Sequence, residues 1–284
     1  MSGPLLLHRF AARCSEWAYE VAAIGLIAVY VNAFEVWQAL GESLGQTTAN
    51  FIPLWLAAAV GAFAIVAAIH RLAQRQPVGW WTLAVGGVLA GLAFRLADPA
   101  FPAKQAHVPE YLLMALVVHR AFRLHLSGAA LVVATTVATA VLGSHDEFLQ
   151  GLSPDRTFGI RDIAVNAVAG LAGALICYAL EGAPRLTRIG STAEGRLGAS
   201  EWVAMGILFG GWVGLFLATY EFRGVVMPTW PVAPLVAGAF AWSISREMAT
   251  PVRGGRQVAA TIAVLMLATT LYPLTAHALS LVFH

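Results

Sequence analysis

The sequence predicts an all-α fold: a polytopic transmembrane helical bundle with about nine spans. Hydrophobic residues make up 59% of the 284 residues and charged residues only 11%, whereas about 25% of the residues in a soluble domain are charged. The mean hydropathy is +0.73, and long apolar stretches recur along the chain. Arginines also concentrate in alternate loops, as the positive-inside rule requires of a membrane protein. This composition excludes a cytosolic enzyme, a disordered tail and a disulfide-stapled secreted module.

A span needs about 20 largely apolar residues, and this requirement defines the candidate helices. They lie at about 17–39, 51–70, 78–97, 108–124, 126–143, 160–180, 200–220, 229–245 and 257–281. The first is expected to be a retained helix, because Met1 to Ser15 is too short and too rich in arginine to contain a cleavable signal. The eighth is short and begins at a Trp-Pro pair, so a re-entrant segment, and eight spans in total, is the alternative. No linker interrupts the chain, so residues 1–284 are expected to form a single integral membrane domain.

The arginines predict the orientation of these spans. Of the 17 basic residues, most fall on the N-terminal side of the bundle: Arg9, Arg13, Arg71, Arg75, Arg120, Arg123, Arg185, Arg188, Arg196, Arg246, Arg253 and Arg256. Lys104, Arg156, Arg161 and Arg223 fall on the other side, with Arg95 near the end of the third span. We therefore expect a multi-pass protein of a bacterial-type inner membrane, with its N-terminus in the cytoplasm and His284 outside. The basic residues form no run interleaved with aromatics, so no nucleic-acid partner is expected.

Ionisable side chains are costly within a bilayer and mark candidate sites. The first group of them precedes the fourth span. His107, Glu110 and Tyr111 share one helical face by their i, i+3 and i+4 spacing, with Pro109 in the first turn. Glu110 has an alternative role as an acid at a helix N-terminus, and Tyr111 as an interfacial belt residue. Lys104, just before them, has no such structural explanation.

The second group lies between the fifth and sixth spans, at 143–162. Ser144 and Glu147 have the spacing of a capping box, which predicts a short surface helix beginning at Ser144. On that helix Asp146 and Gln150 align by i, i+4 spacing.

The sixth span continues the polar pattern with a stripe of Asp162, Asn166 and Gly170. A lipid-facing Asp162 or Asn166 would lack hydrogen-bond partners, so this stripe is expected to face the bundle. The alternative to a functional site is a polar clamp, in which Asn166 joins helices and Arg161 pairs with an acid. His119, at the inner boundary of its span, is expected to be solvated.

These residues together resemble a known membrane family. The pattern is Lys104-x-x-His107-x-x-Glu110-Tyr111-x-Leu113, then Asp146-Glu147-x-x-Gln150, Pro154-x-Arg156, Arg161-Asp162, Asn166 and Gly170. It is similar to the VanZ-like family, named for a protein linked to resistance to the glycopeptide antibiotic teicoplanin. The similarity covers about 80–180, a VanZ-like core within a larger protein. Ala103 and Asp155 depart from the family pattern, which often has an acid and a glycine at these places.

The resemblance implies a cell-envelope protein that affects glycopeptide sensitivity, but it supplies no reaction. One hypothesis is binding of an anionic envelope lipid, or of a lipid-linked or glycopeptide-related ligand, by an extracytoplasmic polar site. Its ligand-binding residues would be Lys104, Tyr111, Gln150, Arg156, Arg161, Asp162 and Asn166, with the arginines holding anionic groups.

The alternative is an integral-membrane enzyme acting on an envelope lipid. His107, Glu110, Asp146 and Glu147 would then supply acid and base catalysis. A transporter is the second alternative. These side chains could also hold a divalent ion, but no HxxxH or DxD spacing demands one, so neither metal nor cofactor is expected.

Overall fold

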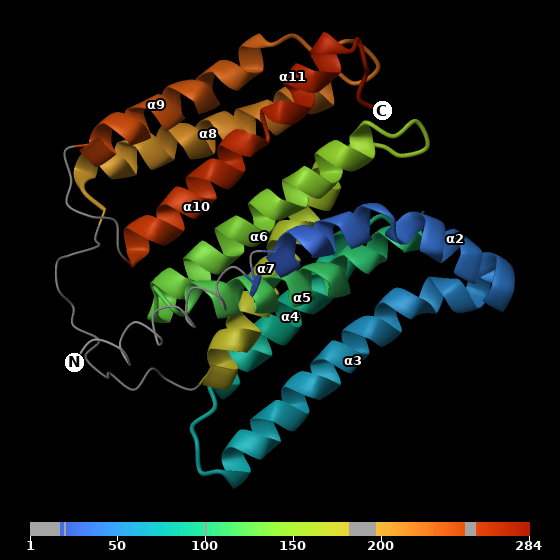
Figure 1. The fold of residues 1–284 in the computed structure, drawn as a ribbon. Coiled ribbons are helices and arrows are strands. Elements are labelled where there is room, and N and C mark those ends of the chain that lie inside the picture. Colours follow the sequence, from blue (N-terminus) through green and yellow to red (C-terminus); the bar gives the residue numbers. More distant parts are fainter. Residues whose placement is uncertain (1–17, 20, 100, 182–196, 248–253) are drawn as a thin grey trace. The chain divides into compact units, whose positions relative to one another are not determined.

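The computed structural model describes residues 18–19, 21–99, 101–181, 197–247 and 254–284 (Figure 1). This part of the chain is helical and contains no strand, apart from one isolated bridge between Val226 and Val282. Five helices are long and apolar enough to cross a membrane, and a sixth span results if a bent pair, Val21–Val31 with Glu35–Leu44, counts as one. The all-helical class is therefore confirmed, and its apolar helices are compatible with a membrane-embedded protein.

All nine predicted stretches fall on helical segments, although their bounds differ. The helices are α2 (Ala33–Leu44), α3 (Gln46–Ala73), α4 (Trp80–Leu96), η1 (Pro102–Ala106), α5 (His107–Phe122), α6 (Gly128–Gly151), α7 (Ile160–Glu181), α8 (Ala199–Glu221), η2 (Trp230–Val232), α9 (Ala233–Glu247), α10 (Gly255–Ala268) and α11 (Leu271–Ala278). The candidate spans are α3, α6, α7, α8 and the continuous stretch Gly255–Ala278. The predicted count of nine is higher because it includes shorter helices such as α4, whose 17 residues extend about 25 Å.

The chain divides into two compact units. The first comprises residues 1–139 and 165–187, and the second comprises residues 140–164 and 188–284. Both α6 and α7 contribute one part to each unit. The single membrane domain expected from the sequence stays a prediction.

In the first unit, α7 packs closely against its neighbours through glycines. A Cβ on Gly173 would lie 2.6 Å from the Cβ of Ala115 in α5, and a Cβ on Gly86 of α4 would lie 2.8 Å from Ile176. Small residues at such positions allow helix backbones to approach closely, which is the usual basis of helix association in membranes. The C-terminal end of α7 is also joined to the start of α4, because the Gly79 amide donates to the Ala179 carbonyl at 3.0 Å.

In the second unit, α8 and α9 lie side by side, and α10 contacts both (Figure 1). Gly211 of α8 and Gly238 of α9 permit this approach, because an added Cβ at either would come within 2.9 Å of the facing helix.

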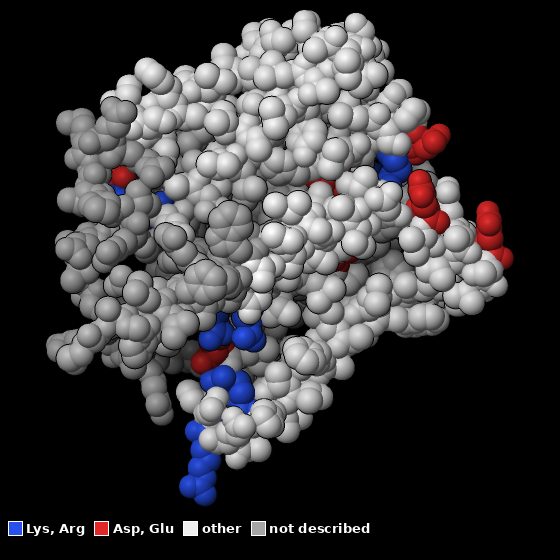
Figure 2. Space-filling model, viewed as in Figure 1, with Lys and Arg blue, Asp and Glu red and all other residues white. Residues whose placement is uncertain are grey.

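Large apolar side chains cover the outside of the helices. Trp81 is 82% exposed and Phe63 67% exposed, and the view in Figure 2 is dominated by uncharged residues, with Lys, Arg, Asp and Glu confined to a few small groups. Exposed apolar surface on this scale marks an interaction with an apolar environment. Lipid is the environment that the composition already predicts.

Candidate functional site

The C-terminal end of α6 corrects the predicted border of the fifth span. The helix continues to Gly151 instead of ending near 143, so no separate surface helix begins at Ser144. The Ser144 hydroxyl donates to the Val141 carbonyl at 2.7 Å and accepts the Trp212 indole N–H at 2.9 Å. The capping-box interpretation is therefore wrong, because Ser144 is satisfied inside a continuing helix by a tryptophan distant in sequence.

Because α6 continues, three carboxylates are buried. Asp146 and Glu147 in its last turns are both 0% exposed, and Asp162 in the first turn of α7 is 2% exposed. We call Asp146, Glu147 and Asp162 the acid cluster. Buried carboxylates are very costly unless hydrogen-bonded or neutralised, so in a chain this poor in charge the acid cluster is a candidate site.

Gly159 shapes the acid cluster. Its amide donates to Glu147 Oε2 at 3.1 Å, and its carbonyl accepts the Asp162 amide at 3.1 Å. A Cβ at this position would lie 2.5 Å from Asp162 Oδ2. Only glycine therefore allows the backbone to reach Glu147 while leaving the Asp162 side chain in place.

The segment between α6 and α7 is held by polar bonds at both sides. Arg156 donates from its guanidinium to Gln150 Oε1, which fixes the cation against the end of α6. Two backbone bonds tie in the last residue of the chain: the Phe158 amide donates to the His284 carbonyl at 2.7 Å, and the His284 amide donates to the Gly151 carbonyl at 2.8 Å.

Aromatic rings from α6, from this segment and from the C-terminal residues pack together. The ring centroids of Phe148 and Phe158 are 5.3 Å apart, those of Phe148 and Tyr272 are 5.4 Å apart, and those of Phe148 and Phe283 are 6.0 Å apart. These ring contacts join the end of α6 to the segment before α7 and to the C-terminal residues.

His145 also has a structural role. Its Nε2 lies 3.0 Å from the Leu265 carbonyl, which can only accept, so this nitrogen carries a proton. Its Nδ1 lies 2.9 Å from the Tyr272 hydroxyl. Both ring nitrogens are thus used in joining α6 to the α10–α11 stretch.

His107, Glu110 and Tyr111 lie on one face of α5, as their spacing predicts. His107 begins α5, Pro109 lies in its first turn, and His107 Nδ1 is 3.5 Å from Glu110 Oε2. The rings of His107 and Tyr111 are 6.2 Å apart. Sequence reasoning missed Tyr30, whose hydroxyl donates to the Glu110 carbonyl at 2.8 Å and whose ring lies 5.8 Å from that of Tyr111; a lone tyrosine inside an apolar stretch was the available signal.

The predicted site residues divide between the two compact units. The second unit holds Asp146, Glu147, Gln150, Arg156, Arg161 and Asp162, and the first holds Lys104, His107, Glu110, Tyr111 and Asn166. Arg161 is exposed, whereas Asn166 is fully buried. Neither side-chain atom of Asn166 has a hydrogen-bond partner among the described residues, so the predicted clamp through this amide is not seen there.

A second cluster of polar side chains, which sequence reasoning missed, lies at the C-terminal end of α7 in the first unit. His119 is fully buried, contrary to the expected solvated role, because its Nε2 lies 3.1 Å from Glu181 Oε2. Arg123 Nη1 lies 3.1 Å from Glu181 Oε1. Glu181 directly follows the predicted sixth span at 160–180, and no motif in the sequence singles it out.

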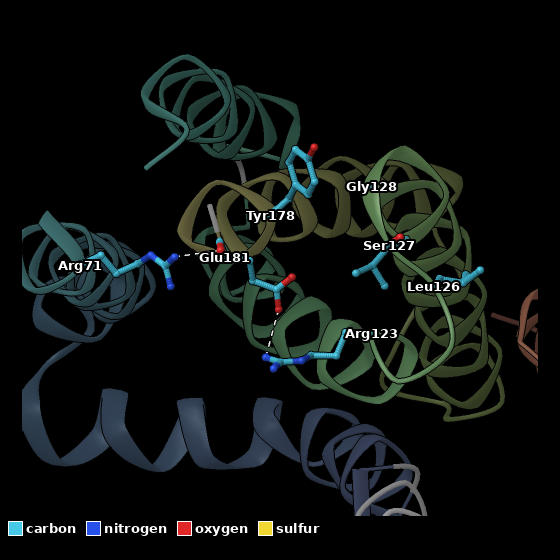
Figure 3. A pocket seen from close by; sticks show the side chains of 8 residues that line it. Arg71, Arg123, Leu126, Ser127, Gly128, Tyr178 and Glu181 are labelled. Carbon is cyan, nitrogen blue, oxygen red and sulfur yellow. Dashed lines mark hydrogen bonds and ion pairs between the residues drawn. The ribbon is translucent and has the colours of Figure 1, made fainter. Parts of the chain in front are cut away.

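A cavity of about 320 Å³ opens beside Glu181. We call it the arginine pocket; its lining residues are Arg71, Arg123, Leu126, Ser127, Gly128, Leu131, Tyr178 and Glu181. Figure 3 shows Glu181 between Arg71 and Arg123, with Ser127 and Gly128 across the opening.

Comparison with known proteins finds no matching family model, no similar curated protein and no similar solved structure.

Proposed function

We propose that the chain is a VanZ-like multi-pass membrane protein of the cell envelope that binds or processes an anionic envelope lipid or a glycopeptide-related ligand. The site would comprise the acid cluster together with Gln150, Arg156 and the residues around them. Through this ligand the protein would affect sensitivity to glycopeptide antibiotics. The membrane is a bacterial-type inner membrane in this proposal, and the site lies on its extracytoplasmic face.

One observation carries the proposal: a buried amide beside the acid cluster has an unsatisfied hydrogen-bond donor, which a purely structural core would pair. Gln150 is 4% exposed, and its Nε2 has no hydrogen-bond partner among the described residues. It lies one turn after Asp146 on α6. Leaving a buried donor unsatisfied costs about 1–3 kcal/mol, so a bound ligand that accepts this hydrogen bond would recover stability.

Arg156 supports an anionic ligand. It is half-buried, and the bond to Gln150 Oε1 holds its guanidinium in one direction. A guanidinium carries a permanent positive charge and a planar fork of donors, which suits the recognition of phosphate or carboxylate. The carboxylates of the acid cluster would accept hydrogen bonds from the hydroxyl or ammonium groups of the same ligand.

The enzymatic alternative has its own supporting observation. The 3.5 Å approach of His107 to Glu110 pairs an imidazole with a carboxylate, which is a common arrangement for acid and base catalysis.

Nine spans are part of the proposal. The support is that α4 and the Trp230–Ser245 helix are apolar helices at the positions where the sequence predicts spans, and that α5 is a helix at the predicted fourth span. Arg71, Arg75, Arg120 and Arg123 support a cytoplasmic N-terminus, while Arg9, Arg13, Arg185, Arg188, Arg196 and Arg253 lie outside the described residues. A reporter fused after Ser153 should read as extracytoplasmic, and a cytoplasmic signal would refute this orientation.

The test of the site uses Glu147→Gln, Arg156→Lys and Asp162→Asn, each measured for protein level in the membrane and for teicoplanin susceptibility. Asp155→Asn is the matched control, because Asp155 is an exposed acid in the same segment. We expect normal protein levels with a lost phenotype for the three site variants and no change for the control. An unchanged phenotype at normal level in all three would refute the site, and loss of protein in all three would assign the residues to the fold alone.

Lipid analysis of membranes with and without the protein separates a binder from an enzyme. An accumulated envelope-lipid precursor in its absence would support catalysis. An unchanged lipid profile together with a changed antibiotic response would support binding.

A further inference from the structure

From the arginine pocket we infer a second binding site, specific for a phosphate group, at the end of α7 opposite to the acid cluster. It lies within the first unit and does not depend on the proposed function. Its volume of about 320 Å³ is within the usual range of small-ligand sites.

Arg71 is the main reason. Its Nη2 donates to the Glu181 main-chain carbonyl at 2.8 Å, which is a neutral partner. Its Nε is buried and has no hydrogen-bond partner, and no carboxylate pairs with it among the described residues. A half-buried guanidinium without a counter-ion is costly near a membrane, and a bound anion would remove this cost.

Glu181 does not cancel this charge. Its two carboxylate oxygens already lie 3.1 Å from His119 Nε2 and from Arg123 Nη1. With Arg71, Arg123 and Glu181 as its charged groups, the lining carries one net positive charge. The acid therefore holds Arg123 in position and leaves the pocket attractive to anions.

The N-terminal end of α6 borders the same cavity. Gly128 and Leu131 of its first turn and the preceding Ser127 all line the pocket. The first four amides of a helix have no partner within the helix, and together with the helix dipole they favour phosphate. Arg71, Arg123, Ser127 and the start of α6 thus all border one cavity (Figure 3).

The phosphate has two plausible sources, a phospholipid headgroup or a soluble phosphate compound. Arg71 and Arg123 belong to the arginines that the sequence assigns to the cytoplasmic side, where basic pockets between transmembrane helices bind anionic headgroups. Tyr178 and Leu131 add apolar surface that an acyl chain would contact.

The test measures binding of dioctanoyl-phosphatidylglycerol to the full-length purified chain in detergent, with dioctanoyl-phosphatidylcholine for comparison. Arg71→Gln should weaken binding of the anionic lipid about fivefold, the effect of one basic group near such a headgroup. Ser127→Ala should weaken it by a smaller factor. Glu181→Gln should strengthen it, because it removes the negative charge of the lining.

Arg75→Gln is the matched control, since Arg75 is exposed, lies just beyond the same helix end and does not line the pocket. It should bind as the parent chain does. Equal affinity of the parent and Arg71→Gln would overturn the site, as would an equal loss in Arg75→Gln. Competition by inorganic phosphate would support a soluble phosphate as the ligand, and its absence would support the lipid headgroup.

Discussion

The carboxylates at the two ends of α7 differ in their exposure to solvent. At the N-terminal end Asp162 is 2% exposed, beside a glycine whose amide binds Glu147. At the C-terminal end the Glu181 side chain is 31% exposed and lies between a histidine and an arginine at the edge of a cavity. The same side-chain chemistry is thus enclosed at one end and accessible at the other.

This difference has a physical consequence. Enclosed charges depend on fixed partners, and removing the surrounding structure is strongly destabilising. A half-exposed ion pair contributes little to stability, is weakened by salt, and can exchange partners with a ligand. Substitutions that change side-chain packing should therefore have their main effect at the acid cluster. Added salt should have its main effect at the arginine pocket.

The largest loss of stability should come from Phe283→Ala. Phe283 is fully buried and packs on Phe148 and Phe158, so its loss should cost about 3–5 kcal/mol of unfolding free energy. Thermal unfolding in detergent measures this, with Leu281→Ala as control because Leu281 is exposed. An equal, small effect of both variants would show that the packing of these aromatic rings contributes little to stability.

Gly159→Ala should have an intermediate effect. The new Cβ would lie 2.5 Å from Asp162 Oδ2, so either the carboxylate or the Gly159 amide must move, at a cost of about 1–3 kcal/mol. The same unfolding measurement checks this. Gly87→Ala is the matched control, since nothing lies within 4 Å of a Cβ there, and a control as unstable as the variant would contradict the steric argument.

Glu181→Gln should have the smallest effect on stability, about 1 kcal/mol or less, because the ion pair it breaks is partly exposed. Unfolding at low and at high salt should show a difference from the parent chain that shrinks as salt rises. The difference caused by Gly159→Ala should be unaffected by salt. A large, salt-independent loss in Glu181→Gln would mean that both ends of α7 are equally enclosed.

Parts of the site followed from spacing alone. His107, Glu110 and Tyr111 lie on one face of α5 because a helix places i, i+3 and i+4 residues together. Pro109 lies in the first turn of this helix, where it costs no hydrogen bond. Both are local rules, which need no knowledge of the rest of the fold.

Other parts depended on partners far away in the sequence. Ser144 lies in α6 because Trp212 donates to it, and His145 is structural because Leu265 and Tyr272 occupy its nitrogens. His119 is buried because it meets Glu181 at the end of another helix. No local pattern contains these contacts.

The sequence by itself determined the class of this protein: helical, apolar and compatible with a membrane, with helices at the predicted stretches. Hydropathy and helical periodicity are sums over neighbouring residues, so a single chain is enough to read them. Only the tertiary structure decided that α6 continues past Ser144, that three carboxylates are buried, and that Arg71, Arg123 and the start of α6 share a cavity. Burial and charge compensation are set by long-range packing, in which each group is satisfied by residues that the chain brings back from far away.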